Sequence, residues 1–259
     1  MARSFPLTAN LYSFFTEIGE LSHFAGRFFK ELFSRPFEFR EFLRQCYQMG
    51  NKSLVLVGIT GFILGLVFTL QSRPTLMEFG AVSWMPSMIS ISIVREIGPV
   101  IIALICAGRI GSSIGAELGS MRVTEQIDAM EVSGTNPYKF LVVTRILAAT
   151  LMLPVLILIG DFIALIGSAM VENVKGNVSF LLYFNQVFEA LEFSDLLPAT
   201  VKSFFFGFAI GLVGCFKGYY SSKGTAGVGK AANSAVVFTS LLLFVLDFIA
   251  VFVSDVIYG

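Results

Sequence analysis

Five ionisable side chains lie inside long apolar stretches and are the first residues that could do chemistry: Arg95, Glu96, Asp161, Lys202 and Asp247. Placing each in the middle of a bilayer is unfavourable by on the order of 3 kcal/mol, so such residues normally face a partner or a cavity. A cation there can bind an anionic group, and a carboxylate can relay protons. The set indicates either a polar binding site or charge pairs that only hold helices together.

A second chemical pattern is Gly-Thr-Ala-Gly-Val-Gly-Lys at 224–230, which has the glycines and the lysine of a phosphate-binding loop. Ala231 stands where that loop needs a hydroxyl for magnesium, and an apolar helix is expected before it instead of a β-strand. We therefore expect a basic connecting loop here, with no ATP, magnesium or other cofactor bound by this chain.

The composition indicates a membrane protein, because 55% of the 259 residues are hydrophobic and the 14% that are charged are clustered. A soluble protein would carry about a quarter charged residues, spread along every exposed face. The net charge is zero, which disfavours nucleic-acid binding. Cys46, Cys106 and Cys215 have no spacing typical of a disulfide framework or a zinc site, so no metal site is expected.

Apolar runs long enough to cross a bilayer predict an all-α integral membrane protein with about five transmembrane helices. The second run could also be two short elements. Glycines at four-residue spacing, such as Gly61 with Gly65 and Gly207 with Gly211, predict close helix packing. The five predicted spans cover residues 53–72, 82–108, 146–171, 196–216 and 231–253.

Phenylalanines recur at helical spacing in residues 10–34, with charged residues between them. This pattern predicts an amphipathic helix in the membrane interface, or alternatively one packed on a soluble partner. Pro36 ends it, and residues 37–47 repeat the pattern more weakly. We divide the chain into interfacial helices over 1–50 and a membrane domain over 51–259. No cleavable signal peptide is expected.

Basic residues predict the orientation, since 14 of the 18 Lys and Arg residues lie in the N-terminal region and in two of the predicted loops. Such residues stay in the cytoplasm, which puts the N-terminus there and the C-terminus in the periplasm. Residues 178–190 would form an amphipathic helix on the outer side. Asp161, Lys202 and Asp247 would lie in the outer third of the bilayer.

Residues 121–133 predict a short cytoplasmic helix, with Thr124 as its N-cap and Gly134 as its stop. Such a helix could dock into a soluble motor subunit or be an ordinary connection.

Several segments together resemble the MlaE family of ABC permeases, and the similarity covers nearly all of the chain after about residue 40. The segments are Arg95-Glu-Ile-Gly-Pro-Val100, Ala107-Gly-Arg-Ile-Gly-Ser112, Gly115-Ala-Glu117, Met121-Arg, Thr124-Glu-Gln-Ile127, Met130-Glu131, Val201-Lys-Ser203, Gly227-Val-Gly229 and Leu246-Asp-Phe248.

The resemblance implies a homodimeric inner-membrane permease that pairs with a separate ABC ATPase subunit. It also implies an MCE-domain protein and often a small STAS-domain protein as partners. Related complexes move phospholipids between inner and outer membranes and so maintain outer-membrane lipid asymmetry. ATP and magnesium would be bound by the partner ATPase.

The resemblance also assigns roles to residues at matching positions. The lipid pocket is assigned to Arg95, Glu96, Lys202 and Asp247, and Asp161 has no assigned role. We expect apolar residues of the first span, Leu66, Phe68 and Leu70, to hold acyl chains. The ATPase contact is assigned to the helix that contains Arg122, Glu125, Gln126, Ile127, Asp128 and Met130.

Other functions remain open from the residues alone. In a proton-coupled secondary transporter, Glu96, Asp161 and Asp247 would relay protons, but the sequence has no convincing inverted repeat. A scaffold would not need several buried charges at similar depth. An enzyme is disfavoured because the only histidine, His23, lies in the N-terminal amphipathic region.

Overall fold

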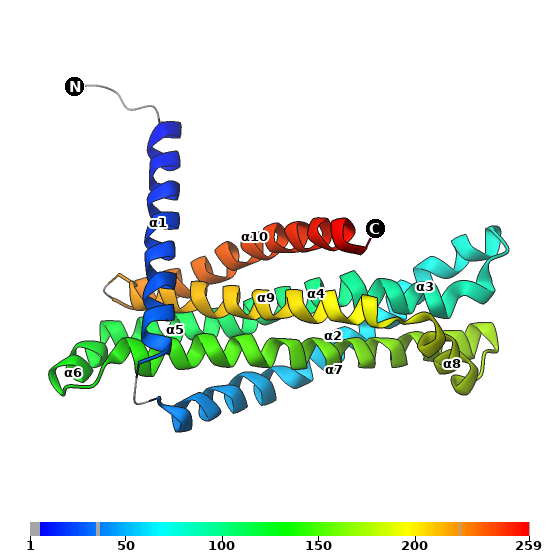
Figure 1. Cartoon of the computed structure of the whole chain (residues 1–259), viewed down its shortest axis with the longest axis horizontal. Helices are drawn as coiled ribbons and strands as arrows, with labels where there is room; N and C mark the ends of the chain where they lie inside the picture. The colour runs from blue at the N-terminus through cyan, green and yellow to red at the C-terminus, as the bar shows by residue number, and fades with distance from the viewer. Residues whose placement is uncertain (1–5, 35–36, 223, 259) are drawn as a thin grey trace.

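The computed structural model describes residues 6–34, 37–222 and 224–258, and the regular elements in these ranges are all helical. Five helical stretches are long and apolar enough to cross a membrane, as the sequence predicted. They lie side by side in one elongated bundle (Figure 1). Their bounds are α2 (Phe39–Glu78), η1 to α5 (Val82–Val123), η4 with α7 (Tyr138–Gly176), α9 (Phe193–Tyr219) and α10 (Thr225–Tyr258).

The second span is one continuous helical run interrupted by two π-helical turns. Its parts are η1 (Val82–Trp84), α3 (Met85–Ser92), η2 (Ile93–Ile97), α4 (Gly98–Cys106), η3 (Ala107–Gly111) and α5 (Ser112–Val123). Pro99 lies two residues after the end of η2, and a proline ring clashes with a regular α-helical turn before it. The π-turn relieves that clash and holds Arg95 and Glu96. Such turns are frequent at functional sites.

Glycines allow the long helices to approach backbone to backbone. A Cβ atom on Gly65 of α2 would lie 1.8 Å from the carbonyl oxygen of Ala164 on α7. One on Gly207 of α9 would lie 2.5 Å from the carbonyl oxygen of Ala149. The predicted close packing at these glycines is confirmed, and α7 lies between α2 and α9.

The N-terminal helix α1 (Pro6–Leu32) runs across one end of the bundle, roughly at right angles to the spans (Figure 1). Phe24 and Phe28 are buried, and Phe24 packs edge-on against Tyr138 and Phe216. Phe29 remains exposed. The helix is amphipathic over its described side chains, whereas the side chains of residues 6–14 lie outside the description.

Residues 39–50, which the sequence grouped with the interfacial helices, continue without a break into the first span within α2. Gly50 and Asn51, residue types that often end a helix, stand at the join but remain helical here. At the opposite end of the bundle lies α8 (Phe180–Ala190), in the predicted amphipathic region, with Ser179 as its N-cap. Tyr183 anchors it through a 2.7 Å hydrogen bond to the Ser168 hydroxyl. Burial raises the pKa of Tyr183 to about 12, so its hydroxyl keeps the proton that it donates.

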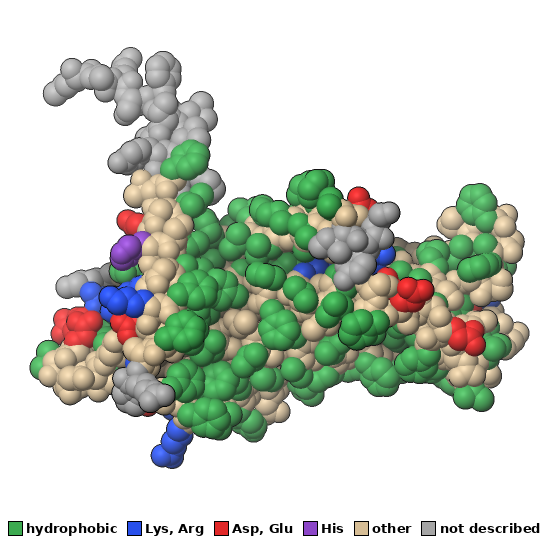
Figure 2. Space-filling model, viewed as in Figure 1, with side chains coloured by type: hydrophobic (Ala, Val, Ile, Leu, Met, Phe, Trp, Pro, Cys, Tyr) green, Lys and Arg blue, Asp and Glu red, His purple; other side chains and the backbone are tan. Residues whose placement is uncertain are grey.

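Two bundle ends are distinguished below: the α6 end, which carries α1 and α6, and the α8 end. Lys, Arg, Asp and Glu side chains gather at the α6 end, and apolar side chains cover much of the bundle between the ends (Figure 2). The 224–230 stretch also lies at the α6 end, where Gly224 turns the chain with φ of +93° and α10 begins at Thr225. Because the helix α9 precedes it, this stretch lacks the strand of a phosphate-binding loop.

Candidate functional site

Lys202 is the centre of a charged cluster built by three separate elements near the α8 end. Its ammonium nitrogen lies 2.7 Å from Oε2 of Glu96 on η2 and 3.1 Å from Oδ1 of Asp247 on α10. The Lys202 side chain on α9 is only 5% exposed, whereas that of Glu96 is 40% exposed. The sequence analysis grouped these three residues, and the structure brings them into contact.

Arg95 points to a different partner in the same region. Its guanidinium nitrogen lies 3.7 Å from Oδ1 of Asp195, near the start of α9. Asp195 was missed by sequence reasoning because it reads as a capping residue, and it does form a capping box with Glu192. Asp195 therefore belongs both to the helix cap and to the Arg95 ion pair.

A pocket of about 380 Å³, counted with its open mouth, lies beside this cluster and is called the Lys202 pocket below. Its lining includes Arg95, Glu96 and Lys202, together with Asp255 of α10. Lys202 already has two carboxylate partners, so an entering phosphate could take the remaining ammonium donor or replace one of them. The released carboxylate could then face an ammonium group. The geometry therefore suits a ligand that carries both charges.

Asp161 on α7 lies outside the ion-pair cluster, although we expected it to join the same polar site. Its side chain is buried against Gly98, and its Oδ1 has no hydrogen-bond partner among the described residues. A small neighbouring pocket connects it to Ala199 and Ser203 of α9. The expectation was based on depth alone, and depth does not decide which way a side chain points.

Leu66, Phe68 and Leu70, the expected acyl-chain contacts, do not line the Lys202 pocket. Leu66 lies against Gly167 of α7, and Phe68 packs on the cluster that contains Met85. A single chain therefore does not bring these apolar residues next to the charges. Any shared cavity would need a second copy.

The predicted cytoplasmic helix is α6 (Gln126–Val132), which follows a sharp corner after α5. The expectation that Thr124 caps α6 is wrong: its hydroxyl bonds back to the Ser120 carbonyl at 2.9 Å, so Thr124 ends α5 instead. Glu125 makes the corner with φ of 58°, and Gly134 follows the helix end with φ of 79°, as predicted for a stop.

The residues expected to contact an ATPase fall into two groups. Ile127 is fully buried and Met130 is partly buried against the core, so both attach α6 to the bundle. Arg122 and Asp128 form an ion pair across the corner. The side chains available at the surface are those of Arg122, Glu125, Gln126 and Asp128.

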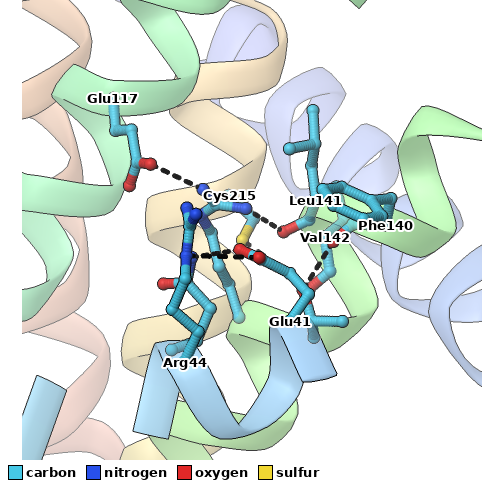
Figure 3. Close-up of polar contacts among 10 residues, drawn as sticks. Glu41, Arg44, Glu117, Phe140, Leu141, Val142 and Cys215 are labelled. Atoms are coloured by element: carbon cyan, nitrogen blue, oxygen red, sulfur yellow. Dashed lines mark hydrogen bonds and ion pairs between the residues drawn. The ribbon is translucent and has the colours of Figure 1, made fainter. Parts of the chain in front are cut away.

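A second charged cluster lies at the α6 end and was missed because Arg145 was counted with a connecting segment. The Arg145 side chain on α7 is 0% exposed and donates to Oε1 of Glu117 on α5 at 2.8 Å. It also donates to the Leu141 carbonyl at 3.0 Å. Figure 3 shows Glu117 and the Leu141 carbonyl at this point, with Glu41 nearby paired with Arg44 of its own helix. The sequence feature that could have indicated this cluster is Arg145 itself, a single arginine directly before an apolar run.

The comparisons with known proteins agree with one another. A family model described as "Permease MlaE" matches residues 42–253. A probable ABC transporter permease protein of Rickettsia typhi is 41% identical over 80% of this chain and 80% of its own length. One from Synechocystis is 33% identical over 86% of this chain and 85% of its own length.

A plant protein is also similar to this chain. The chloroplastic protein TRIGALACTOSYLDIACYLGLYCEROL 1 of Arabidopsis thaliana is 31% identical over 87% of this chain and 64% of its own length. Similarity to bacterial and plant proteins thus extends over most of the membrane bundle.

Proposed function

The chain belongs to the MlaE family of ABC transporter permeases, and from this premise we propose that it moves phospholipids between the inner and outer membranes. As an ABC permease it is the membrane subunit, and a separate subunit hydrolyses ATP. One relative carries a glycolipid's name, which supports a lipid as cargo. In this proposal the transport helps to maintain outer-membrane lipid asymmetry.

The Lys202 pocket is the observation that carries the proposal. Its wall contains Lys202, which pairs with Glu96 and with Asp247, so the charges come from three elements that could separate, η2, α9 and α10. The lipid phosphate would displace a carboxylate from Lys202, and the headgroup ammonium would take that carboxylate. ATP-driven movement of α6 would be transmitted through α5 to Glu96, close the pocket and expel the lipid.

The working unit is a homodimer in this proposal. A second copy would place Leu66, Phe68 and Leu70 beside a Lys202 pocket and so supply the acyl-chain surface that one chain lacks. The exposed apolar side chains on α10, among them Phe248 and Phe252, are available for that contact. An MCE-domain protein would receive the lipid at the α8 end, and a STAS-domain protein could bind the ATPase.

The proposed location is the bacterial inner membrane, with the α6 end and the N-terminus cytoplasmic and the C-terminus periplasmic. The cluster of basic residues at the α6 end supports this orientation. In the same orientation α1 would lie in the cytoplasmic interface, and the surface of α6 would contact the ATPase.

The test is to purify the tagged full-length protein from mild detergent and to identify co-purifying proteins and lipids by mass spectrometry. We expect an ABC ATPase, an MCE-domain protein and bound phospholipid. Lys202→Met should lower the bound phospholipid, while Lys175→Met, an exposed lysine near the α8 end, should not. Recovery without an ATPase and without phospholipid would overturn the proposal.

A further inference from the structure

A second polar pocket lies at the α6 end, between the first half of α2 and the η3–α5 stretch. Its lining includes Lys52 and Ser53 of α2, Arg109 of η3, and Ser113 and Glu117 of α5. It holds about 440 Å³, counted with its open mouth, and is called the Lys52 pocket below. The pocket is therefore comparable in size to the Lys202 pocket.

The charges in the Lys52 pocket are arranged to receive an anion. Lys52 and Arg109 are exposed, and neither has an ion-pair partner in the part of the chain that the structure describes. Glu117 is the single carboxylate among the described lining residues, and the buried Arg145 already neutralises it. Two positive charges remain without a counter-charge, whereas the lining of the Lys202 pocket balances Arg95 and Lys202 with Glu96 and Asp255.

Ser53 provides a second, independent indication of a ligand. Its side chain is 1% exposed, and its hydroxyl oxygen has no hydrogen-bond partner among the described residues. Other hydroxyls of α2 are satisfied within the helix: Thr60 donates to the Leu56 carbonyl at 2.7 Å, and Thr69 to the Gly65 carbonyl at 2.8 Å. A buried hydroxyl without a partner destabilises a protein, so the Ser53 hydroxyl is suited to bond a ligand in the pocket.

The position of the pocket at the membrane boundary indicates that the ligand is a membrane component. Lys52 directly precedes the uncharged run 53–72, and Arg109 directly follows the uncharged run 97–108, so both mark the same membrane boundary. Lipid phosphates lie at this depth. Exposed apolar side chains continue along α2 from the pocket, including Val55 and Ile59, and could contact acyl chains. Arg109 is 13 residues from Glu96, or roughly 20 Å along the helix, which separates the two pockets.

We propose that the Lys52 pocket binds the phosphate of an anionic phospholipid from the leaflet at the α6 end. Lys52 and Arg109 provide the charge, and Ser53 donates a hydrogen bond. This inference rests on the proposed function for its orientation, in which that leaflet is the cytoplasmic one. Lys52 and Arg109 could also be basic residues that simply flank spans on the cytoplasmic side. That alternative does not explain why the Ser53 hydroxyl in the same pocket is buried without a hydrogen-bond partner in the described ranges.

The test measures bound lipid by native mass spectrometry of the purified permease complex, released from nanodiscs of phosphatidylcholine with or without phosphatidylglycerol. Lys52→Gln/Arg109→Gln should lower phosphatidylglycerol occupancy about tenfold or more, because two charge-assisted hydrogen bonds are lost. Lys52→Arg/Arg109→Lys should retain it. The matched control Lys30→Gln/Arg40→Gln removes two exposed charges outside the pocket and should bind as wild type.

Ser53→Ala should give a smaller loss, about threefold, whereas Thr60→Ala should give none. The inference fails if the Lys52/Arg109 double variant keeps wild-type occupancy, or if inorganic phosphate in lipid-free detergent occupies the site as well as the lipid does. If the wild-type complex shows no ATP-dependent lipid transfer, the proposed function is overturned instead. Lys202→Met should abolish transfer and leave phosphatidylglycerol in the Lys52 pocket, which separates the two claims.

Discussion

The two buried charged clusters, around Lys202 and around Arg145, differ in how firmly their cations are held. Arg145 is completely buried, has one carboxylate partner and also bonds a backbone carbonyl of its own helix. Lys202 is held by two carboxylates that are themselves 40% and 17% exposed, at the edge of an open pocket. Glu117, the partner of Arg145, is also 35% exposed, so the two clusters differ in the cation itself. Lys202 lines an open pocket and can meet a ligand, while Arg145 is sealed among helices and supports the fold.

Arg145→Met should have the largest effect of the variants considered, and that effect should be a loss of protein stability. The variant removes the fully buried member of the pair and its bond to the Leu141 carbonyl, while Glu117 stays 35% exposed, so the loss should approach the lower end of the about 3–5 kcal/mol seen for buried pairs. We expect poor yield and early thermal aggregation in detergent, followed by fluorescence-detected size exclusion. Arg145→Met/Glu117→Gln should recover part of the stability. A single variant as stable as wild type would show that the Arg145 cluster does not support the fold.

Ile127→Ala should have the next largest effect, confined to α6. Removing a fully buried isoleucine side chain usually destabilises by about 2–5 kcal/mol, and here the loss would loosen the helix that meets the ATPase. We expect ATP hydrolysis by the assembled complex to continue while lipid transfer per ATP falls. Val132→Ala, a 91% exposed position at the end of α6 outside the assigned contact residues, is the control for helix integrity. Unchanged transfer per ATP in Ile127→Ala would contradict the role of α6.

Glu96→Gln/Asp247→Asn should have the smallest effect on overall transfer, because the Lys202 cation remains. Lys202 is only 5% exposed and loses both carboxylate partners, so the variant should also be less stable than wild type. Its functional effect should be on headgroup preference. Without the two carboxylates the pocket loses the groups that would face an ammonium, so transfer should shift from phosphatidylethanolamine towards phosphatidylglycerol by several-fold. Competition between the two labelled lipids in one vesicle population measures this. An unchanged ratio of the two transferred lipids would mean that the carboxylates do not determine headgroup preference.

The helical architecture could be predicted from the sequence because each span is a long apolar run whose ends carry charges. The glycine spacing likewise predicted close helix packing. At Gly65 and Gly207 the neighbouring backbone occupies the space that a Cβ atom would need. The contacts of Lys202 with Glu96 and Asp247 are consistent with the grouping made from depth and from family resemblance.

Other parts of the site depended on side-chain direction, which depth and spacing do not fix. Asp161 lies at a suitable depth but faces Gly98, and Asp195 was hidden because capping residues and ion-pair partners look alike in sequence. The π-turn that carries Glu96 has no reliable sequence pattern beyond the proline after it. Arg145 was assigned to a loop because the helix containing it begins earlier than its hydropathy suggests.

The most direct test of the account is ATP-dependent transfer of labelled phospholipid by the reconstituted complex, comparing wild type, Lys202→Met and Lys175→Met. The account predicts at least a tenfold loss for Lys202→Met, equivalent to about 1.4 kcal/mol or more of lost binding, with normal assembly and ATPase subunit content. Lys175→Met should transfer as wild type. Wild-type transfer by a correctly assembled Lys202→Met complex would contradict the claim that lipid passes through the Lys202 pocket.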